Sequence, residues 1–418
     1  MSKKDLKKNF LGRPFKALRP DNKSVNEVIA PPYDVISRSE AKSLAEEKPS
    51  SFLRVSRAEL EMDGDINPYD KAVYQRARKN LDKLRSDGKL LLEKTPSFYV
   101  YQISNSSHFQ TGVALSASVE AYNNNRIRKH ELTRHAKESD RTMQIETVNA
   151  ITGPVLLVHA NHDPLDKLLQ DISSSRPCDY SGTLDGWLHS IWVVDDPDYA
   201  ENIGAAINAI PCLYIADGHH RSAAAARVAR ARNTDRDNHD APHNGFLAVT
   251  FPESDMLILD YNRVVKDLNN LTTEKFFERL SLTYEIEDSD IAVKPKAPKT
   301  FGMYLDGNWF LLSLKKPHES SDPINELDVS LLEETILRPI LNISDARTDT
   351  RIDFIGGSRG TEAISQVVDN AAMRVGFTLF PTKMAELMAV ADANLIMPPK
   401  STWFDPKLAD GLLSIPLD

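Results

Sequence analysis

The stretch that decides the fold is "CLYIADGHHRSAAAARVAR", Cys212 to Arg230. An apolar run typical of a buried strand ends at Asp217, Gly218 permits a tight turn, and an alanine-rich helix pattern begins directly afterwards. A strand, a turn and a helix in this order present unsatisfied N–H groups and the positive end of the helix dipole to an anion. The stretch therefore predicts an anion site at the start of a helix that runs to about Arg232.

The charges at this helix start strengthen the interpretation. Arg221 lies in the first turn, where a cation opposes the helix dipole by roughly 0.3–1 kcal/mol unless an anion sits between them. His219 and His220 add hydrogen-bond donors, and Asp217 either caps the helix or faces the ligand. We expect phosphate binding by Gly218 and Arg221, with Asp217, His219 and His220 as candidate catalytic residues. The alternative is a plain capped helix with a solvated end.

A second cluster is "RKHELTRHAKESDR", Arg128 to Arg141. On a helix, Arg134, Glu138 and Arg141 would share one face. Such charge runs are usually solvated surfaces, but one so rich in Arg and His equally fits a clamp for phosphate or carboxylate. We expect it to converge with the first cluster on one anion. Its candidate binding residues are His130, Arg134, Lys137, Glu138 and Arg141.

A third motif is "VIAPPYDVIS", Val28 to Ser37. Two prolines fix an extended loop that presents Tyr33 and Asp34. The loop is either a stiff connector or a rigid support that places Asp34 in the site as a base or metal-binding carboxylate. We expect it to line the same pocket as the two clusters.

Two motifs remain nearer the C-terminus. In "RIDFIGGSRG", Arg351 to Gly360, a short strand runs into Gly356-Gly357-Ser358, which could cradle a phosphate, although a lone glycine pair is a weak signal. In "MPPKSTWFDPKL", Met397 to Leu408, two prolines fix an extended loop, and Trp403 and Phe404 favour a buried anchor.

The pattern outside these motifs predicts the α/β class (α+β mixed), with mixed sheets and flanking helices. Residues 97–103 and 111–121 read as an antiparallel pair, and a β-α-β-α-β rhythm runs from residue 153 to 251. Residues 300–313 read as a hairpin that turns at Asp306-Gly307. We expect an N-terminal α/β region over residues 1–285, with the phosphate-binding core, and a C-terminal α/β region over 286–418.

Composition narrows the class of protein. The 418 residues carry a net charge of −9, which argues against a nucleic-acid or membrane-surface binder, and no apolar run approaches the roughly 20 residues of a membrane span. Two cysteines are too few for a disulfide framework. Zinc, EF-hand, nucleophile-elbow, P-loop and dinucleotide motifs are absent. We expect a soluble cytoplasmic protein; the sequence leaves its oligomeric state open.

Six motifs together resemble the DUF1015 family of uncharacterised bacterial and archaeal proteins, and they span nearly the whole chain. They are "RPFKALRP", "VIAPPYDVIS", "HELTRHAKESDR", "ADGHHRSAAA", "RIDFIGGSRG" and "MPPKSTWFDPKL". The family is associated with serine-biosynthesis genes, so the resemblance points to serine metabolism without assigning an activity.

A more distant resemblance covers about a tenth of the chain. "DGHHRSAAA" is similar to the helix-opening motif of the ParB/sulfiredoxin superfamily, in which a strand, turn and helix bind nucleotide phosphates. Sulfiredoxin has a cysteine where this chain has His219, and a ParB protein has a DNA-binding helix-turn-helix. The ADP-dependent free serine kinases match best, with Asp, His and Arg at the spacing of Asp217, His220 and Arg221. This resemblance implies phosphate contacts for His220 and Arg221, and a Mg²⁺ or substrate-hydroxyl contact for Asp217.

Together these observations predict phosphoryl transfer on a small hydroxy or amino acid, with serine or O-phosphoserine favoured and the direction, kinase or phosphatase, left open. ADP or ATP and Mg²⁺ are the implied cofactors, and a small phosphorylated molecule is the implied partner. His219 or His220 would act as acid, base or phosphohistidine. Asp34 is the candidate general base. The alternative is a non-catalytic nucleotide-binding regulator of the ParB type.

Overall fold

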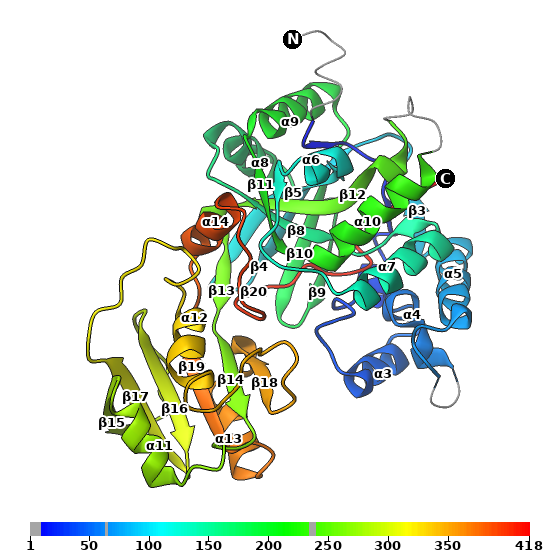
Figure 1. The fold of residues 1–418 in the computed structure, drawn as a ribbon. Helices are drawn as coiled ribbons and strands as arrows, with labels where there is room; N and C mark the ends of the chain where they lie inside the picture. Colours follow the sequence, from blue (N-terminus) through cyan, green and yellow to red (C-terminus); the bar gives the residue numbers. More distant parts are fainter. Residues whose placement is uncertain (1–9, 63–65, 234–239) are drawn as a thin grey trace. The chain divides into compact units, whose positions relative to one another are not determined.

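The computed structural model describes residues 10–62, 66–233 and 240–418 (Figure 1). It has the predicted mixed α/β class. The chain forms two compact units, Met1–Met256 with Pro406–Asp418, and Leu257–Asp405. The boundary expected at residue 285 lies inside strand β15 (Tyr284–Ser289) of the second unit, and the last residues of the chain return to the first unit.

The first unit is built on a mixed sheet. Strand β11 pairs in parallel with β6, and β12 pairs in parallel with β8; the other neighbours are antiparallel. Along the sheet the order is β6 (Ile127–Arg128), β11 (Leu213–Asp217), β8 (Val155–His159), β12 (Gly245–Pro252), β5 (Phe109–Ser118), β4 (Phe98–Ser104), β10 (Trp187–Val194) and β9 (Tyr180–Leu184). Smaller pairings join β1 (Gly12–Arg13) to β5, β2 (Leu18–Pro20) to β3 (Leu90–Leu92), and β7 (Ala150–Ile151) to β21 (Ile415–Pro416).

The predicted strand, turn and helix form at β11. Leu213 and Ile215 are completely buried, and Gly218 takes a φ of 100°, a left-handed conformation that favours glycine. Helix α10 (His219–Arg232) follows at once, contacts β8 and β12, and packs along α7 (His135–Val148). A Cβ on Gly218 would lie 3.3 Å from the Cα of Val155, so the glycine also lets the turn approach β8 closely.

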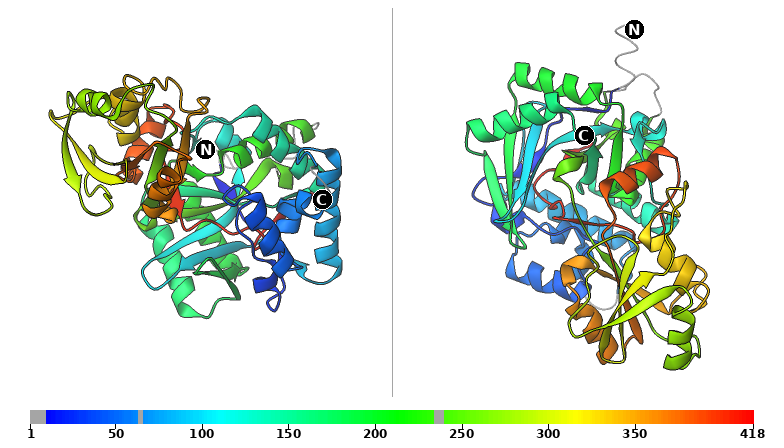
Figure 2. Two further views of the ribbon diagram at one scale, coloured as in Figure 1. Left: turned by 90° about the horizontal axis from the view of Figure 1, so that it is seen from below. Right: turned by 90° about the vertical axis from the view of Figure 1, so that its left-hand side faces the viewer.

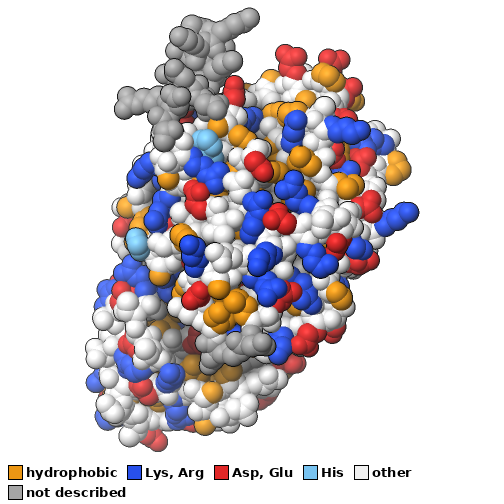
Figure 3. All heavy atoms as spheres, turned by 90° about the vertical axis from the view of Figure 1, so that its right-hand side faces the viewer, with side chains coloured by type: hydrophobic (Ala, Val, Ile, Leu, Met, Phe, Trp, Pro, Cys, Tyr) orange, Lys and Arg blue, Asp and Glu red, His pale blue; other side chains and the backbone are white. Residues whose placement is uncertain are grey.

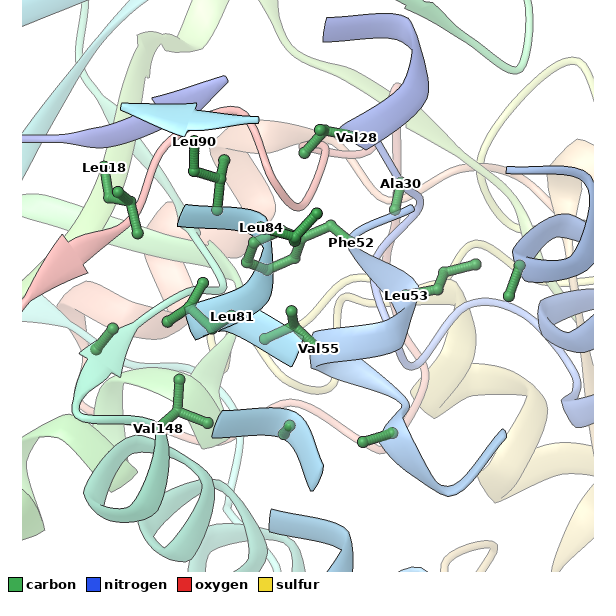
Figure 4. Close-up of a cluster of buried hydrophobic side chains, with 14 of the residues drawn as sticks. Leu18, Val28, Ala30, Phe52, Leu53, Val55, Leu81, Leu84, Leu90 and Val148 are labelled. Atoms are coloured by element: carbon green, nitrogen blue, oxygen red, sulfur yellow. The ribbon is translucent and has the colours of Figure 1, made fainter. Parts of the chain in front are cut away.

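A buried apolar cluster supports the N-terminal helices of the first unit. Figure 4 shows Phe52, Val55, Leu81, Leu84 and Val148 within it. Burial of such side chains stabilises the fold by about 1.5–3 kcal/mol each. The other helices of this unit are α2 (Val25–Val28), α3 (Arg38–Glu47), α4 (Leu53–Ser56), η1 (Ala58–Glu61), α5 (Lys71–Ser86), α6 (Val119–Asn123), α8 (Asp163–Ser175), α9 (Pro197–Ala209), η2 (Pro242–Asn244) and η3 (Glu253–Asp255).

The C-terminal segment lies beside N-terminal residues of the same unit (red and dark blue in Figure 2). Backbone bridges join Leu18 to Ser414 and Ala30 to Asp410. Because Ala30 precedes "PPYD", these bridges place residues 406–418 next to the loop that carries Asp34.

The second unit has its own antiparallel sheet, and the hairpin predicted over residues 300–313 is confirmed. Its order is β15, β17 (Asn308–Leu314), β16 (Thr300–Leu305), β19 (Val375–Leu379), β14 (Tyr261–Val265) and β18 (Ile352–Gly356), and β13 (Leu257–Leu259) pairs with β20 (Trp403–Asp405). Its helices are α11 (Thr273–Leu280), α12 (Asp328–Leu332), η4 (Glu333–Leu337), η5 (Gly357–Arg359), α13 (Glu362–Asp369) and α14 (Met384–Asp392).

The surface drawn in Figure 3 mixes both signs of charge, with Lys and Arg interspersed among Asp and Glu. Among the helices that the structure describes, none combines the length and apolar character that crossing a membrane requires.

Candidate functional site

The candidate site begins where β11 ends. Gly218 is the N-cap residue of α10, and it offers no side chain to the first helical turn. The N–H groups at such a start need partners from outside the helix. Asp217 does not act as the cap, because its carboxylate is held by another residue.

That residue is Lys407. Its Nζ donates to Oδ2 of Asp217 across 3.0 Å, although 190 positions separate the two in sequence. Burial alone would raise the pKa of Asp217, but Lys407 and Arg221 hold it below its usual value. Asp217 is therefore ionised at neutral pH, and a cation that sequence reasoning missed lies at the mouth of the helix.

His219 packs inward against His130. The two rings meet edge to face with their centroids 4.5 Å apart, and each residue is less than 5 % exposed, at 4 % and 3 %. Burial lowers the pKa of both, that of His130 to about 4. Nδ1 of His219 lies 3.7 Å from a carboxylate oxygen of Glu131. Both rings are therefore neutral at pH 7 and enclosed, which leaves His219 poorly placed for the acid–base role expected of it.

His220 connects α10 to the start of α7. The backbone N–H of Arg134 donates to its Nε2 across 3.0 Å. Because a backbone N–H only donates, Nε2 is unprotonated and the neutral ring carries its proton on Nδ1. Burial lowers the pKa of His220, in the same direction. Arg134 is the N-cap residue of α7, so it precedes the helix and does not share the expected helical face with Arg141.

Arg221 is buried and already paired. Its Nη1 donates to the carbonyl of Pro154 across 2.7 Å, and its Nη2 donates to Oδ1 of Asp34 across 3.0 Å. Burial alone would lower the pKa of Arg221, but the neighbouring acids, Asp34 first, raise it. Arg221 therefore has a counter-charge, Asp34, within the chain itself. Among the described residues, its Nε has no hydrogen-bond partner.

Tyr33 lies against both arginines. The Cζ of Arg141 is 4.0 Å from the centroid of its ring, and that of Arg221 is 5.5 Å away. Nη2 of Arg141 donates to Oδ2 of Asp140 across 2.8 Å. Burial raises the pKa of Tyr33 to about 12, so the ring stays neutral. The structure thus brings together the proline-fixed loop, residues 130–141 and the start of α10.

Asp410 is a second residue that sequence reasoning missed. It is 2 % exposed, and burial raises its pKa to about 7 even though Arg221 lowers it. A Cβ on Gly153 would meet both Arg221 Cδ, at 3.3 Å, and Asp410 Oδ1, at 3.8 Å. That carboxylate oxygen has no hydrogen-bond partner among the described residues. A carboxyl that titrates near neutrality therefore lies behind the arginine.

Lys137 is exposed at the edge of this cluster, and Glu138 beside it is partly buried. Nζ of Lys137 is 5.7 Å from the centroid of the Tyr69 ring, and Oε1 of Glu138 accepts from Nη1 of Arg227 across 3.2 Å. Over the described residues, no group of three or more His, Cys, Asp or Glu side chains is arranged to hold a metal ion. The Gly356-Gly357-Ser358 turn belongs to the second unit.

Three solved structures are similar over most of the chain. Free serine kinase in complex with AMP has 13% identity over 76% of this chain and 94% of that chain, with a TM-score of 0.36. SbnI with C-terminal truncation from Staphylococcus aureus has 14% identity over 73% of this chain and 87% of that chain, with a TM-score of 0.39. A conserved hypothetical protein from Pyrococcus furiosus has 12% identity over 74% of this chain and 97% of that chain, with a TM-score of 0.35. Proteins of curated function gave no match. The family model "Protein of unknown function (DUF1015)" matches residues 13–330, and the chain therefore belongs to this family.

Proposed function

We propose that the protein transfers a phosphoryl group to or from a small hydroxy or amino acid, with serine or O-phosphoserine as the substrate. The observation that carries the proposal is the pairing of Asp34 with Arg221 at a helix start that has no side-chain cap. The Asp34 side chain is 44% exposed, so a substrate can reach it. A carboxylate for the hydroxyl proton and a cation for the phosphate thus lie 3.0 Å apart.

The chemistry is positioning and charge neutralisation, as phosphoryl transfer requires. Toward the phosphorylated product, the substrate hydroxyl oxygen bonds to phosphorus, the bond from phosphorus to the donor oxygen breaks, and the hydroxyl proton passes to Asp34. Arg221 and the N–H groups at the start of α10 hold the transferred group, with Arg134 and Arg141 as further cations. In the phosphatase direction, a water oxygen bonds to phosphorus and passes a proton to Asp34, the bond from phosphorus to the serine oxygen breaks, and that oxygen takes up a proton, which gives serine and inorganic phosphate.

His220 serves this site as a hydrogen-bond donor. Its Nε2 is engaged by Arg134, so only the Nδ1–H is available to a ligand. A general base or a phosphohistidine at Nε2 would first have to break that hydrogen bond. The base role is therefore assigned to Asp34.

The cofactors are part of the proposal. ADP or ATP is proposed as the phosphoryl donor because of the resemblance of Asp217–Arg221 to the serine kinase motif, and the buried Nε of Arg221 offers a donor to a phosphate. A Mg²⁺ contact at Asp217 is left out, because over the described residues no group of three or more His, Cys, Asp or Glu side chains is arranged to hold a metal ion there. No step is therefore assigned to a metal at Asp217.

The experiment is ³¹P NMR of the full chain with O-phosphoserine alone, and with serine plus ADP or ATP, each with and without Mg²⁺. We expect conversion by the wild type and a loss of roughly 100-fold or more in Asp34→Asn, the usual contribution of a general base. Asp82→Asn is the matched control, because Asp82 also pairs with an arginine, at 2.9 Å, and is 48% exposed. Nucleotide binding without conversion of serine or O-phosphoserine would instead support the alternative function, a non-catalytic nucleotide-binding regulator. Full activity in Asp34→Asn would remove the base assignment.

A further inference from the structure

Lys407 is fixed at the site by its own segment of chain. Leu408 beside it is 3% exposed, and the backbone of Asp410 exchanges two hydrogen bonds with Ala30, of 2.9 and 3.1 Å. The lysine side chain is 18% exposed and ends on Asp217. The ammonium group of Lys407 therefore lies at the start of α10. The backbone of the C-terminal segment that carries this lysine is fixed by its hydrogen bonds to Ala30.

Stability alone does not account for this ion pair. Exposed ion pairs contribute little, and partly buried ones lose in desolvation about what they gain in attraction. The Asp217 and Lys407 side chains are 33% and 18% exposed, so the pair belongs to the second kind and remains open to a small ligand.

Two polar atoms at the start of α10 also lack hydrogen-bond partners in the described part of the chain. Nε of Arg221 and Nε2 of His219 have no partner among the described residues, and the two residues are 7% and 4% exposed. Buried polar atoms ordinarily have partners, so Nε of Arg221 points to a ligand, whereas His219 is enclosed against His130.

We propose that Lys407 is a phosphate-binding residue of this site. Its Nζ leaves Asp217 for a phosphoryl oxygen of the ligand, and Asp217 holds the ammonium in position until then. This inference rests on the proposed function. A lysine suits the task because its ammonium is a compact charge on a flexible stem that reaches either partner by rotation. Since Asp217 directly precedes the N-cap residue, the ammonium lies at the end of the helix where an anion is stabilised.

The test is calorimetric binding of O-phosphoserine and of serine to Lys407→Met, Asp217→Asn and the double variant. We expect Lys407→Met to weaken O-phosphoserine binding by at least ~10-fold, the loss of one charge-assisted hydrogen bond, and to leave serine binding within ~2-fold. If Lys407 only neutralised Asp217, the double variant would bind as the wild type does. If Lys407 binds phosphate, the double variant stays as weak as Lys407→Met.

Lys89→Met is the control, since Lys89 pairs with Glu27 at 2.8 Å in the same unit. Thermal melting of each variant shows whether it is folded. Unchanged O-phosphoserine binding in folded Lys407→Met, or recovery in the double variant, overturns the Lys407 assignment and leaves the proposed function standing. A wild type that binds and converts none of the phosphorylated compounds overturns both.

Discussion

Two turns in this molecule share one sequence signature and differ in the groups that surround them. In each, a short strand runs into glycine and then into a helical turn, with an arginine three residues beyond the first glycine at Gly218-His219-His220-Arg221 and at Gly356-Gly357-Ser358-Arg359. In the second unit the protein itself fills the space over the glycines. A Cβ on Gly356 would lie 2.4 Å from the Trp403 ring, and one on Gly357 would lie 2.6 Å from an oxygen of Asp260.

At the first turn a Cβ on Gly218 would meet Val155, at 3.3 Å, and two ion pairs lie around the turn. Asp217 with Lys407, and Arg221 with Asp34, flank the start of α10. The comparison teaches that glycine after a strand marks a close approach in both turns, and that the ion pairs around Gly218 set the first turn apart. Beside Trp403 the glycines serve packing, whereas beside Gly218 the surrounding charges leave a function to explain.

The largest expected effect concerns the electrostatics behind the first turn. The pKa of Asp410 is raised to about 7, so between about pH 4 and 7 the folded chain binds more protons than the unfolded chain. The contribution of Asp410 to stability must therefore fall as pH rises through that window, by up to about 4 kcal/mol at 1.36 kcal/mol per pKa unit. Asp410→Asn should remove this contribution and be more stable than the wild type at pH 8. Urea unfolding at pH 5 and pH 8 gives the free energy of unfolding of both proteins. An equal change in this free energy between the two pH values in both proteins would refute the prediction.

The second prediction compares Arg221 at the first turn with Arg359 at the second. Arg221→Lys keeps the charge but loses the fork that bonds Pro154 and Asp34, so we expect a loss of about 100- to 1,000-fold in turnover, roughly 3–4 kcal/mol. Arg359→Lys at the exposed second turn should change turnover by less than ~2-fold. Steady-state kinetics of both variants decide the matter. Equal losses would mean that the comparison between the turns is mistaken.

Sequence patterns predicted the local part of this arrangement. Strand β11, the left-handed glycine and the end of α10 near Arg232 follow from residues that are neighbours in the chain. The same holds for the hairpin at Asp306-Gly307. Lys407 and Asp410 were missed because their partners lie far away in sequence, and no periodicity records such a contact. The pairing of Arg221 was missed for the same reason.

The third prediction concerns packing. Gly356→Ala should destabilise the second unit by about 1–3 kcal/mol, because the added methyl overlaps a rigid indole ring. Gly218→Ala should cost about 1–2 kcal/mol through its φ of 100°. Only the second change should also weaken O-phosphoserine binding. Calorimetric melting measures the loss of stability, and a binding assay measures the affinity for O-phosphoserine. Weaker O-phosphoserine binding in Gly356→Ala would contradict the prediction.

The smallest effect is a proton position at the first turn. The N–H of Arg134 fixes Nε2 of His220 as an acceptor, so the ring should be the neutral Nδ1–H tautomer. Burial lowers the pKa of His220, so this tautomer should persist as the pH falls through 6.5, the usual midpoint for histidine. ¹⁵N NMR of labelled histidine distinguishes the two ring nitrogens, and the same signal in urea-unfolded protein gives the ordinary titration as a control. A His220 ring that is protonated at Nε2 at pH 7 would contradict the hydrogen bond. It would also add Nε2 of His220 to the candidates for general acid, because a protonated Nε2 could give its proton to a leaving oxygen.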